Sequence, residues 1–302
     1  MKAIKRYIPL LATLLLLTGC SQFRNEPVQP AMSEQPVQTQ PEDEAAPEQE
    51  QLPEQTLPEE PAEEPVGESL PEEEPALPTY DFSQPAPERE AVDNTYFEDA
   101  AFVGDSRTDG FMIYSGIGCG KNLTSNGLSI FQLKEKKALK IGGKEYTLLE
   151  ALEMGEYGKV YLCLGVNELG VHDDEGFYQS YLAAIDTIRA IQPRAIIYIQ
   201  GLIPLNEEEI AASGGRDYLK NDHLRIYNDL MRKAAEEKQV VFLDLYAAFA
   251  DETGALPAGA SRDGVHLKKD FCQKWLEYLK THTVDNVTLG LSEREVEEVA
   301  PL

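Results

Sequence analysis

The sequence predicts an α/β fold with three layers, in which helices cover both faces of a central parallel sheet. Three observations lead to this prediction. Strand-like segments recur from residue 100 onward, each of them is apolar at nearly every position, and segments with helical periodicity separate them. A strand that is apolar throughout is buried on both faces, and the helices that connect parallel strands provide that cover.

The predicted strands are four segments rich in Val, Ile and Tyr and bounded by Gly, Asp or Pro. In chain order they cover residues 100–104 (AAFVG), 159–165 (KVYLCLG), 194–202 (RAIIYIQGL) and 240–245 (VVFLDL). Cys163 lies inside the second segment, where we expect it to pack as a small buried hydrophobic residue.

The predicted helices have apolar residues at intervals of three and four. They span residues 177–191, 218–238 and 269–279, and the apolar face of the first comprises Phe177, Tyr181, Ala184, Ile185, Ile188 and Ile191. Residues 121–147 follow no clear period, and there we expect only a small hairpin, at KIGGKEY.

Composition divides the chain into a domain and two flanking segments. Residues 94–284 contain all the segments that could form a core, so we predict one domain there, followed by an acidic tail at 285–302. Residues 21–92 carry 19 acidic and two basic side chains, together with 14 of the 19 prolines. Such a segment cannot bury enough apolar surface to offset its ordering entropy, so we predict that residues 20–93 form a disordered, extended stalk.

Charge and cysteine content exclude several classes of protein. The formal net charge is −26, of which residues 93–302 contribute −12. An acidic folded region is unsuited to binding a phosphate backbone, so we exclude nucleic acid as a partner, and we expect a monomer. Cys119, Cys163 and Cys272 permit at most one disulfide, which excludes a scaffold built on disulfides.

The first twenty residues have the organisation of a bacterial export signal. Three basic residues precede an apolar run over residues 7–17, which is too short to span a membrane in the mature protein. The run ends in LTGC, which resembles a lipobox. We therefore expect residues 1–19 to be removed and Cys20 to carry lipid, which would anchor the protein to the outer face of the bacterial cytoplasmic membrane. The alternative is an ordinary signal peptide with an incidental cysteine.

Polar residues that follow the predicted strands form a candidate catalytic set. Ligands of parallel sheets bind beyond the carboxyl ends of the strands, and Ser106 follows the first strand. A serine nucleophile needs a histidine base and an acid that orients this base, and Asp263 and His266 lie three residues apart near the C-terminus. The Asn167 amide and the Ser106 backbone N–H are candidate donors to an oxyanion. The alternative is that Gly104, Asp105 and Ser106 form an ordinary turn.

These blocks, in this order, resemble those of the SGNH (GDSL-type) hydrolase superfamily. The resemblance covers residues 94–284 and identifies Gly127 as the glycine whose N–H would join Ser106 and Asn167 in the oxyanion hole. It implies a flavodoxin-like parallel sheet and ester hydrolysis by Ser106, His266 and Asp263, with neither a metal nor an organic cofactor. Gly116, Gly118 and Gly120 are alternatives to Gly127.

Two residues depart from the superfamily pattern. Arg107 replaces the leucine of the name motif, and Glu168 stands where many members have aspartate. Arg107 would either meet an anionic or sugar substrate or form a salt bridge with a surface acid, and we favour the salt bridge. Neither departure affects the catalytic set, so both bear on substrate preference.

Other motifs lack the residues that their chemistry needs. Thr108 occupies the last glycine position of an α/β-hydrolase elbow, and residues 115–122 lack two defining positions of a phosphate loop. We expect the His172-Asp173-Asp174 sequence to be a solvated loop rather than a metal site. We expect His223 and His282 to be surface residues.

The sequence thus predicts an extracellular, membrane-anchored serine esterase. Its location and the superfamily suggest O-acetyl groups on cell-wall or other polysaccharide as the substrate. The alternatives are an O-acyltransferase, a lysophospholipase that acts on the adjacent membrane, and a tethered binding module without catalysis. The presence of Ser106, Asn167, Asp263 and His266 together argues against the binding module.

Overall fold

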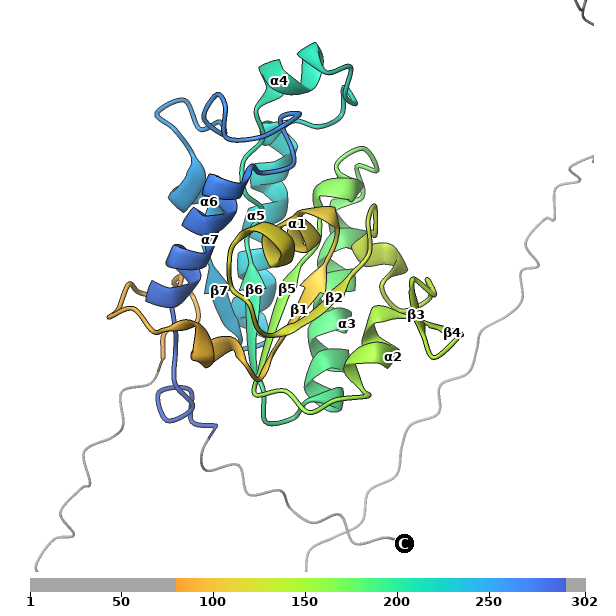
Figure 1. The fold of residues 1–302 in the computed structure, drawn as a ribbon, viewed down its shortest axis with the longest axis vertical. Coiled ribbons are helices and arrows are strands. Elements are labelled where there is room, and N and C mark those ends of the chain that lie inside the picture. The colour runs from red at the N-terminus through yellow and green to blue at the C-terminus, as the bar shows by residue number, and fades with distance from the viewer. Residues whose placement is uncertain (1–79, 292–302) are drawn as a thin grey trace, which may run out of the picture. The chain divides into compact units, whose positions relative to one another are not determined.

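The computed structural model describes residues 80–291. The predicted signal peptide, Cys20, most of the predicted stalk and residues 292–302 lie outside this range. Within it, five parallel strands form a central sheet in the order β2-β1-β5-β6-β7 (Figure 1). Their bounds are Ala100–Gly104 (β1), Lys121–Thr124 (β2), Lys159–Cys163 (β5), Ile196–Gln200 (β6) and Val241–Leu243 (β7).

The strand order explains where a ligand should bind. The chain moves from β1 to the edge strand β2, then returns past β1 to β5, so the order reverses between β1 and β5. This is the flavodoxin-like order, in which ligands bind beyond the carboxyl ends of the strands on either side of the reversal. The predicted fold class, a three-layer α/β/α fold with a parallel sheet, is confirmed.

Two pairs of long helices cover the sheet. Helices α1 (Ser106–Tyr114) and α7 (Lys269–Thr281) contact each other on one face, and α3 (Asp174–Ile191) and α5 (Asn221–Glu237) pack together on the other (Figure 1). The shorter helices are α2 (Leu148–Leu152), α4 (Glu207–Ala212) and α6 (Leu245–Phe249). Three 3-10 turns are η1 (Asn94–Phe97), η2 (Ile130–Gln132) and η3 (Val166–Glu168). The predicted helices are therefore present, with shifted ends.

Aromatic rings in register hold the middle of the sheet. Phe102, Tyr161 and Tyr198 are paired neighbours on β1, β5 and β6, and their rings stack with centroids 4.9 and 4.5 Å apart. Phe111 on α1 contacts both Phe102 and Trp275 on α7, so this stack is covered by the helical layer that begins at Ser106. All five side chains are at most 1 % exposed, so the strand ends that carry the site rest on a rigid core.

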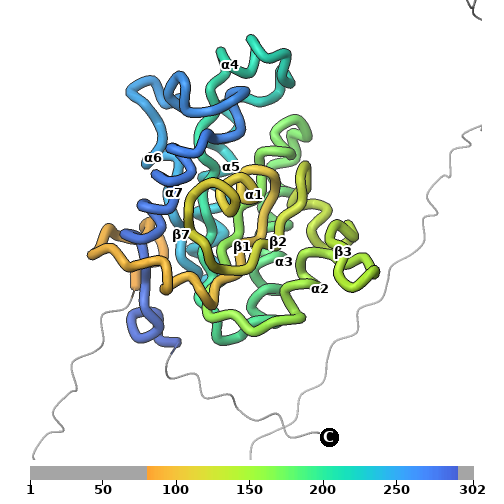
Figure 2. Tube along the Cα trace, viewed as in Figure 1, coloured from red at the N-terminus to blue at the C-terminus, as the bar shows by residue number. Residues whose placement is uncertain are grey.

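The region without a clear period contains a strand and a hairpin. The hairpin pairs β3 (Leu139–Ile141) with β4 (Lys144–Tyr146), as predicted, and Figure 2 shows it beside the β2 edge of the sheet. Strand β2 has no apolar pattern that predicts it, because Leu123 is its one buried residue. It forms because the backbone of β1 offers a parallel partner.

Residues 80–93 pack on the domain, which corrects the predicted boundary of the stalk at residue 93. The N–H of Ala86 donates to the Phe242 carbonyl at 2.9 Å, and the N–H of Arg89 donates to the Thr281 carbonyl at 2.7 Å. Leu289 and Leu291, from the predicted tail, also pack against the core.

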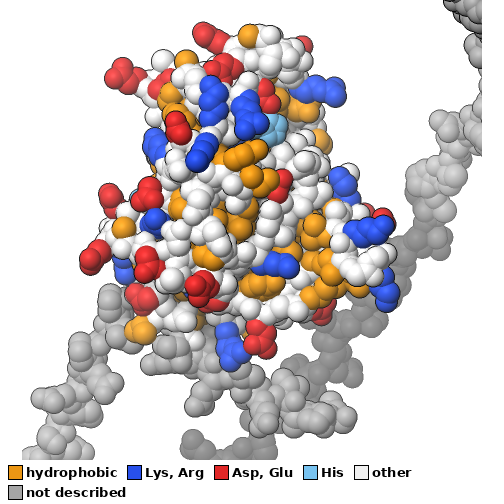
Figure 3. Space-filling view, in the orientation of Figure 1, with side chains coloured by type: hydrophobic (Ala, Val, Ile, Leu, Met, Phe, Trp, Pro, Cys, Tyr) orange, Lys and Arg blue, Asp and Glu red, His pale blue; other side chains and the backbone are white. Residues whose placement is uncertain are grey.

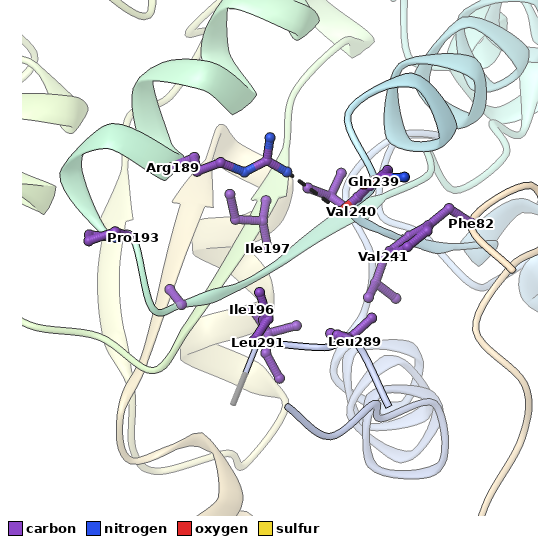
Figure 4. Close-up of a pocket in the computed structure, with 11 residues that line it drawn as sticks. Phe82, Arg189, Pro193, Ile196, Ile197, Gln239, Val240, Val241, Leu289 and Leu291 are labelled. Carbon is purple, nitrogen blue, oxygen red and sulfur yellow. Dashed lines mark hydrogen bonds between the residues drawn. The ribbon is translucent and has the colours of Figure 1, made fainter. Parts of the chain in front are cut away.

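Both flanking segments meet at the amino ends of β6 and β7, far from the strand ends where ligands bind. Figure 4 shows Phe82, Leu289 and Leu291 around a cavity of about 20 Å³ beside Ile196 and Val241. The cavity is hardly larger than one water molecule, so it is a packing gap rather than a substrate site. None of the helices within residues 80–291 has the length and apolar character to cross a membrane.

Candidate active site

Ser106 is held at the junction between β1 and α1. It is the first residue of α1, and Asp105 caps this helix by accepting a hydrogen bond from the Arg107 N–H at 2.9 Å. The tight junction requires Gly104, because a Cβ there would lie 2.2 Å from the Thr108 hydroxyl and 2.8 Å from the Cys163 carbonyl oxygen. The serine therefore leaves the sheet at its carboxyl end, next to β5.

The structure brings Ser106, His266 and Asp263 into one hydrogen-bonded chain. The Ser106 Oγ lies 2.9 Å from His266 Nε2, and His266 Nδ1 lies 2.7 Å from Asp263 Oδ2. The second carboxylate oxygen of Asp263 accepts the backbone N–H groups of His266 at 2.8 Å and Val265 at 3.0 Å. This is the arrangement that general-base activation of a serine requires.

The loop that carries Asp263 and His266 is fixed by contacts with α4. Gly264 has φ +86°, and a Cβ there would lie 2.4 Å from the Asn206 carbonyl oxygen, so only glycine fits. Its N–H donates to Ser261 Oγ at 2.7 Å, and the Ser261 hydroxyl donates to the Glu209 carboxylate. Figure 1 shows α4 and the connection between α6 and α7 on the same side of the sheet.

Asp263 stays ionised because hydrogen bonds outweigh its burial. Burial by itself raises the pKa of the Asp263 carboxyl, but the N–H groups of His266 and Val265 and the His266 imidazole lower it further, so the pKa lies below its ordinary value. A charged Asp263 can stabilise the imidazolium that forms when His266 takes a proton.

Asn167 lies beside the serine loop, but its amide is already engaged. It belongs to η3, directly after β5, and its Nδ2 lies 3.0 Å from Asp105 Oδ2 and 3.0 Å from the Leu128 carbonyl oxygen. Both N–H groups of the amide therefore have acceptors within the chain. Donation to an oxyanion requires that one of these hydrogen bonds be shared or exchanged.

Gly127 lies in the turn after β2, next to the residue that contacts Asn167. The turn is closed by the Leu128 N–H, which donates to the Ser125 carbonyl at 3.1 Å, and the Gly127 N–H has no acceptor among residues 80–291. By contrast, Gly120 packs against the Ala100 carbonyl, at the amino ends of the strands. The position of Gly127 is thus the one compatible with an oxyanion hole.

Three charged residues behind the serine are buried, which sequence reasoning missed. Arg107 is 5 % exposed and donates from both Nη atoms to the Ile203 carbonyl at 3.0 Å, which corrects both the favoured surface salt bridge and direct contact with an anionic substrate. Asp105 is 2 % exposed, and burial raises its pKa against the opposing effect of the Arg107 N–H. Its position before a helix start is a capping signal in the sequence.

Glu168 is fully buried, and its environment opposes ionisation. Burial raises the pKa of Glu168 to about 7, with a further contribution from Asp105, although the Ile130 N–H donates to its Oε1 and has the opposite effect. Its Oε2 has no hydrogen-bond partner among the described residues. Glu168 thus supports the turn after β2 instead of facing a substrate.

A pocket of about 350 Å³ opens beside the triad, a volume suited to a small ligand. Besides Ser106, Asp263 and His266, its lining includes both polar and apolar side chains: Asp109, Ile113, Tyr114, Asn126, Arg262 and Leu267.

The remaining histidines have structural roles. His223, predicted as a surface residue without an acidic partner, lies 2.8 Å from the Leu169 carbonyl oxygen through Nδ1 and 2.7 Å from Asp174 Oδ1 through Nε2. His172 stacks on it, so the His172-Asp173-Asp174 sequence joins α3 to α5 rather than forming a free loop. His282 is half-buried and stacks on Tyr278. Residues 80–291 contain no group of three or more potential metal ligands.

Comparisons with solved structures agree with this fold. One match is the structure of "a putative platelet activating factor from Streptococcus pneumonia", which is 22 % identical, has a TM-score of 0.50, and aligns 63 % of this chain with 84 % of that one. A putative GDSL-like lipase from Parabacteroides merdae is 16 % identical, with a TM-score of 0.47 and coverage of 68 % and 100 %. A GDSL-like lipase from Bacteroides thetaiotaomicron is 13 % identical, with a TM-score of 0.43 and coverage of 60 % and 86 %. No match was found among curated proteins.

The family comparison is more specific. The model of the GDSL-like lipase/acylhydrolase family matches residues 102–271, which include Ser106, Asn167, Asp263 and His266. This match spans more than half of the chain. By its sequence, its strand order and the position of its triad, the chain belongs to the GDSL-like lipase/acylhydrolase family.

Proposed function

We propose that this chain is a serine esterase whose nucleophile is Ser106. The observation that carries the proposal is the hydrogen-bonded chain from Ser106 Oγ through His266 to Asp263, at 2.9 and 2.7 Å. The chain opens into a pocket of ligand size at the carboxyl end of the sheet. An oriented base beside a serine at a pocket is the arrangement that acyl transfer needs.

Acylation begins when His266 Nε2 takes the proton of Ser106 as Oγ bonds to the ester carbonyl carbon. The negative charge that develops on the carbonyl oxygen is stabilised by the N–H groups of Ser106 and Gly127 and by the Asn167 amide. The bond between carbon and the alcohol oxygen then breaks, and His266 returns the proton to the leaving alcohol.

Deacylation repeats these steps with water. His266 takes a proton from water, the resulting hydroxide adds to the acyl carbon, and the bond to Ser106 Oγ breaks as the serine regains a proton. In an acyltransferase, a sugar hydroxyl would take the place of this water.

We propose short acyl esters on an extracellular polysaccharide as the substrate. The pocket supports this proposal because polar and charged groups surround the few apolar side chains, whereas a long acyl chain needs a continuous apolar surface. The predicted export signal and lipidated Cys20 would place the enzyme outside the cell, next to the wall.

Replacement of Ser106 tests the nucleophile. Ser106→Ala should reduce ester hydrolysis by at least about 10⁴-fold, because residues of a triad act as a unit. A fluorophosphonate probe should label the full-length wild type at Ser106 and leave the variant unlabelled. Labelling at another serine, identified by mass spectrometry, would disprove the assignment.

A substrate panel separates the esterase from its alternatives. The full chain should hydrolyse 4-nitrophenyl acetate faster than the octanoate, and should release acetate from an acetylated xylan. Faster hydrolysis of lysophosphatidylcholine would favour the lysophospholipase. Transfer of acetate to added oligosaccharide without release would favour the acyltransferase, and no turnover of any ester would favour the binding module.

The membrane anchor is tested at Cys20. Cys20→Ser should move the processed protein from the membrane fraction to the medium and abolish labelling by a palmitate analogue. A processed protein that remains with the membrane without a label would contradict lipidation.

A further inference from the structure

Arg262 lies within the pocket, next to the catalytic acid. It immediately precedes Asp263, and its backbone N–H donates to the His266 carbonyl at 3.0 Å, so the loop that fixes the triad also fixes Arg262. The side chain is exposed and lines the same pocket as Ser106 and His266.

The guanidinium of Arg262 has no polar partner in the described part of the chain. It lies over the ring of Tyr114 on α1, with 5.1 Å between Cζ and the ring centroid, and it forms neither a hydrogen bond nor an ion pair with residues 80–291. The contact with Tyr114 uses the flat face of the guanidinium and leaves its N–H groups at the edge available. The cation is therefore positioned but not neutralised.

The other charged groups of the pocket are engaged. Arg107 donates to the Ile203 carbonyl, and Asp263 is bound to His266. Asp109 accepts hydrogen bonds from Asn122 Nδ2 at 2.9 Å and Thr124 Oγ1 at 3.2 Å. Arg262 is thus the one charged side chain of this pocket that is open to a ligand.

The charge around Arg262 is opposite to that of the chain as a whole. Lys268 and Lys269 are exposed on the same segment, which leads into α7, although residues 93–302 carry a net −12. Figure 3 shows Lys and Arg side chains gathered on this face near a histidine, while acidic side chains lie mainly toward the edges. A local group of cations in an acidic protein favours an anion at this position.

We propose that the ester substrate carries an anionic oxyacid group, a carboxylate or a phosphate, and that Arg262 binds this group while Ser106 attacks the ester. The planar guanidinium fork matches two oxygens of either group, and Tyr114 holds it in place. The proposal rests on the proposed esterase function and narrows its substrate class to acyl esters of anionic compounds, such as acidic sugars.

Three acetate esters with similar phenolic leaving groups test the proposal on the full chain. They are 3-acetoxybenzoate, 3-acetoxyphenyl phosphate and the neutral 3-acetoxybenzamide. The wild type should prefer one of the anionic esters, and Arg262→Gln should lower the ratio of kcat/KM for that ester to kcat/KM for the amide by about 10-fold. Arg262→Lys should give an intermediate ratio. The preferred anion identifies the carboxylate or the phosphate.

Arg194→Gln is the matched control, because Arg194 is exposed at the amino end of β6 and removes the same charge. It should leave the ratio unchanged. An equal loss in Arg194→Gln and Arg262→Gln, or an unchanged ratio in Arg262→Gln, would overturn the proposal.

Binding to the Ser106→Ala protein separates this proposal from the esterase proposal. Arg262→Gln in that background should weaken the binding of 3-hydroxybenzoate or 3-hydroxyphenyl phosphate, measured by calorimetry, relative to 3-hydroxybenzamide. Absence of ester turnover with binding that depends on Arg262 would refute the esterase alone. Turnover that depends on Ser106, with no effect of Arg262 on either measurement, would refute only the anion site.

Discussion

Asp263 and the pair formed by Asp105 and Glu168 are carboxylates of one site in opposite surroundings. The Asp263 side chain is 40 % exposed and accepts three N–H hydrogen bonds, so its pKa is lowered. Asp105 and Glu168 are buried, and burial raises the pKa of each. Both arrangements follow from the balance between desolvation and hydrogen bonding.

The difference separates a carboxylate that supports charge from two that support position. Asp263 must remain negative when His266 becomes positive, and its hydrogen bonds provide for that. Asp105 and Glu168 hold backbone and amide groups instead: Asp105 holds Arg107 and Asn167, and Glu168 holds Ile130. Substitutions in the two groups should therefore have different effects.

The largest effect is expected at Asp263. Asp263→Asn keeps the shape of the side chain but favours the wrong His266 tautomer, which in the serine-protease precedent costs about 10⁴-fold in turnover. Steady-state kcat on a short acyl ester is the measurement. Asp217→Asn, at an exposed site between α4 and α5, is the control and should be neutral. A loss of only a few-fold at Asp263 would mean that another carboxylate orients His266.

Asn167 should show an intermediate effect. If its amide exchanges one hydrogen bond for the oxyanion, Asn167→Ala should lower kcat by about 10²- to 10³-fold, or roughly 2.7–4 kcal/mol, with little change in KM. The reason is that this interaction strengthens only as negative charge develops.

A buried asparagine with a purely structural role provides the control. Asn228 Oδ1 accepts the Leu202 N–H at 2.6 Å and its Nδ2 donates to the Leu202 carbonyl at 3.0 Å, outside the site. Asn228→Ala should lower the melting temperature while turnover per folded molecule stays the same. If Asn167→Ala behaves in this way too, Asn167 serves only to join Asp105 to Leu128.

The smallest effect is expected at Glu168 and concerns stability. Its pKa of about 7 in the folded state exceeds the ordinary value of 4.5, so the folded protein binds a proton that the unfolded chain releases. The free energy of unfolding should therefore fall as pH rises from about 4.5 to about 7, by up to about 3 kcal/mol. Glu168→Gln should remove this part of the pH dependence.

Urea denaturation of Glu168→Gln between pH 4.5 and 8 measures this contribution. Glu236→Gln, on the exposed side of α5, is the control and should keep the pH dependence of the wild type. A pH profile of Glu168→Gln identical to that of the wild type would show that Glu168 is ionised in the folded protein and would remove the contrast with Asp263.

The sequence by itself determined the features that depend on local pattern. β1, β5, β6 and β7 are apolar runs, and a run that is apolar at every position is buried whatever surrounds it. The Gly104-Asp105-Ser106 turn and the Asp263 to His266 spacing are short-range arrangements as well. The expectation that Ser106 and Asn167 meet followed from the general rule that the ends of parallel strands share an edge.

Only the tertiary structure decided the features that depend on a distant partner. β2 has one buried residue and needs the edge of β1, and residues 80–93, in a segment whose composition predicts disorder, are held by β7 and α7. Arg107 and Glu168 are charged residues that a sequence places at the surface, and they are buried because the Ile203 carbonyl and the Ile130 N–H face them. The contact of Arg262 with Tyr114 joins residues from opposite ends of the domain, which no local pattern encodes.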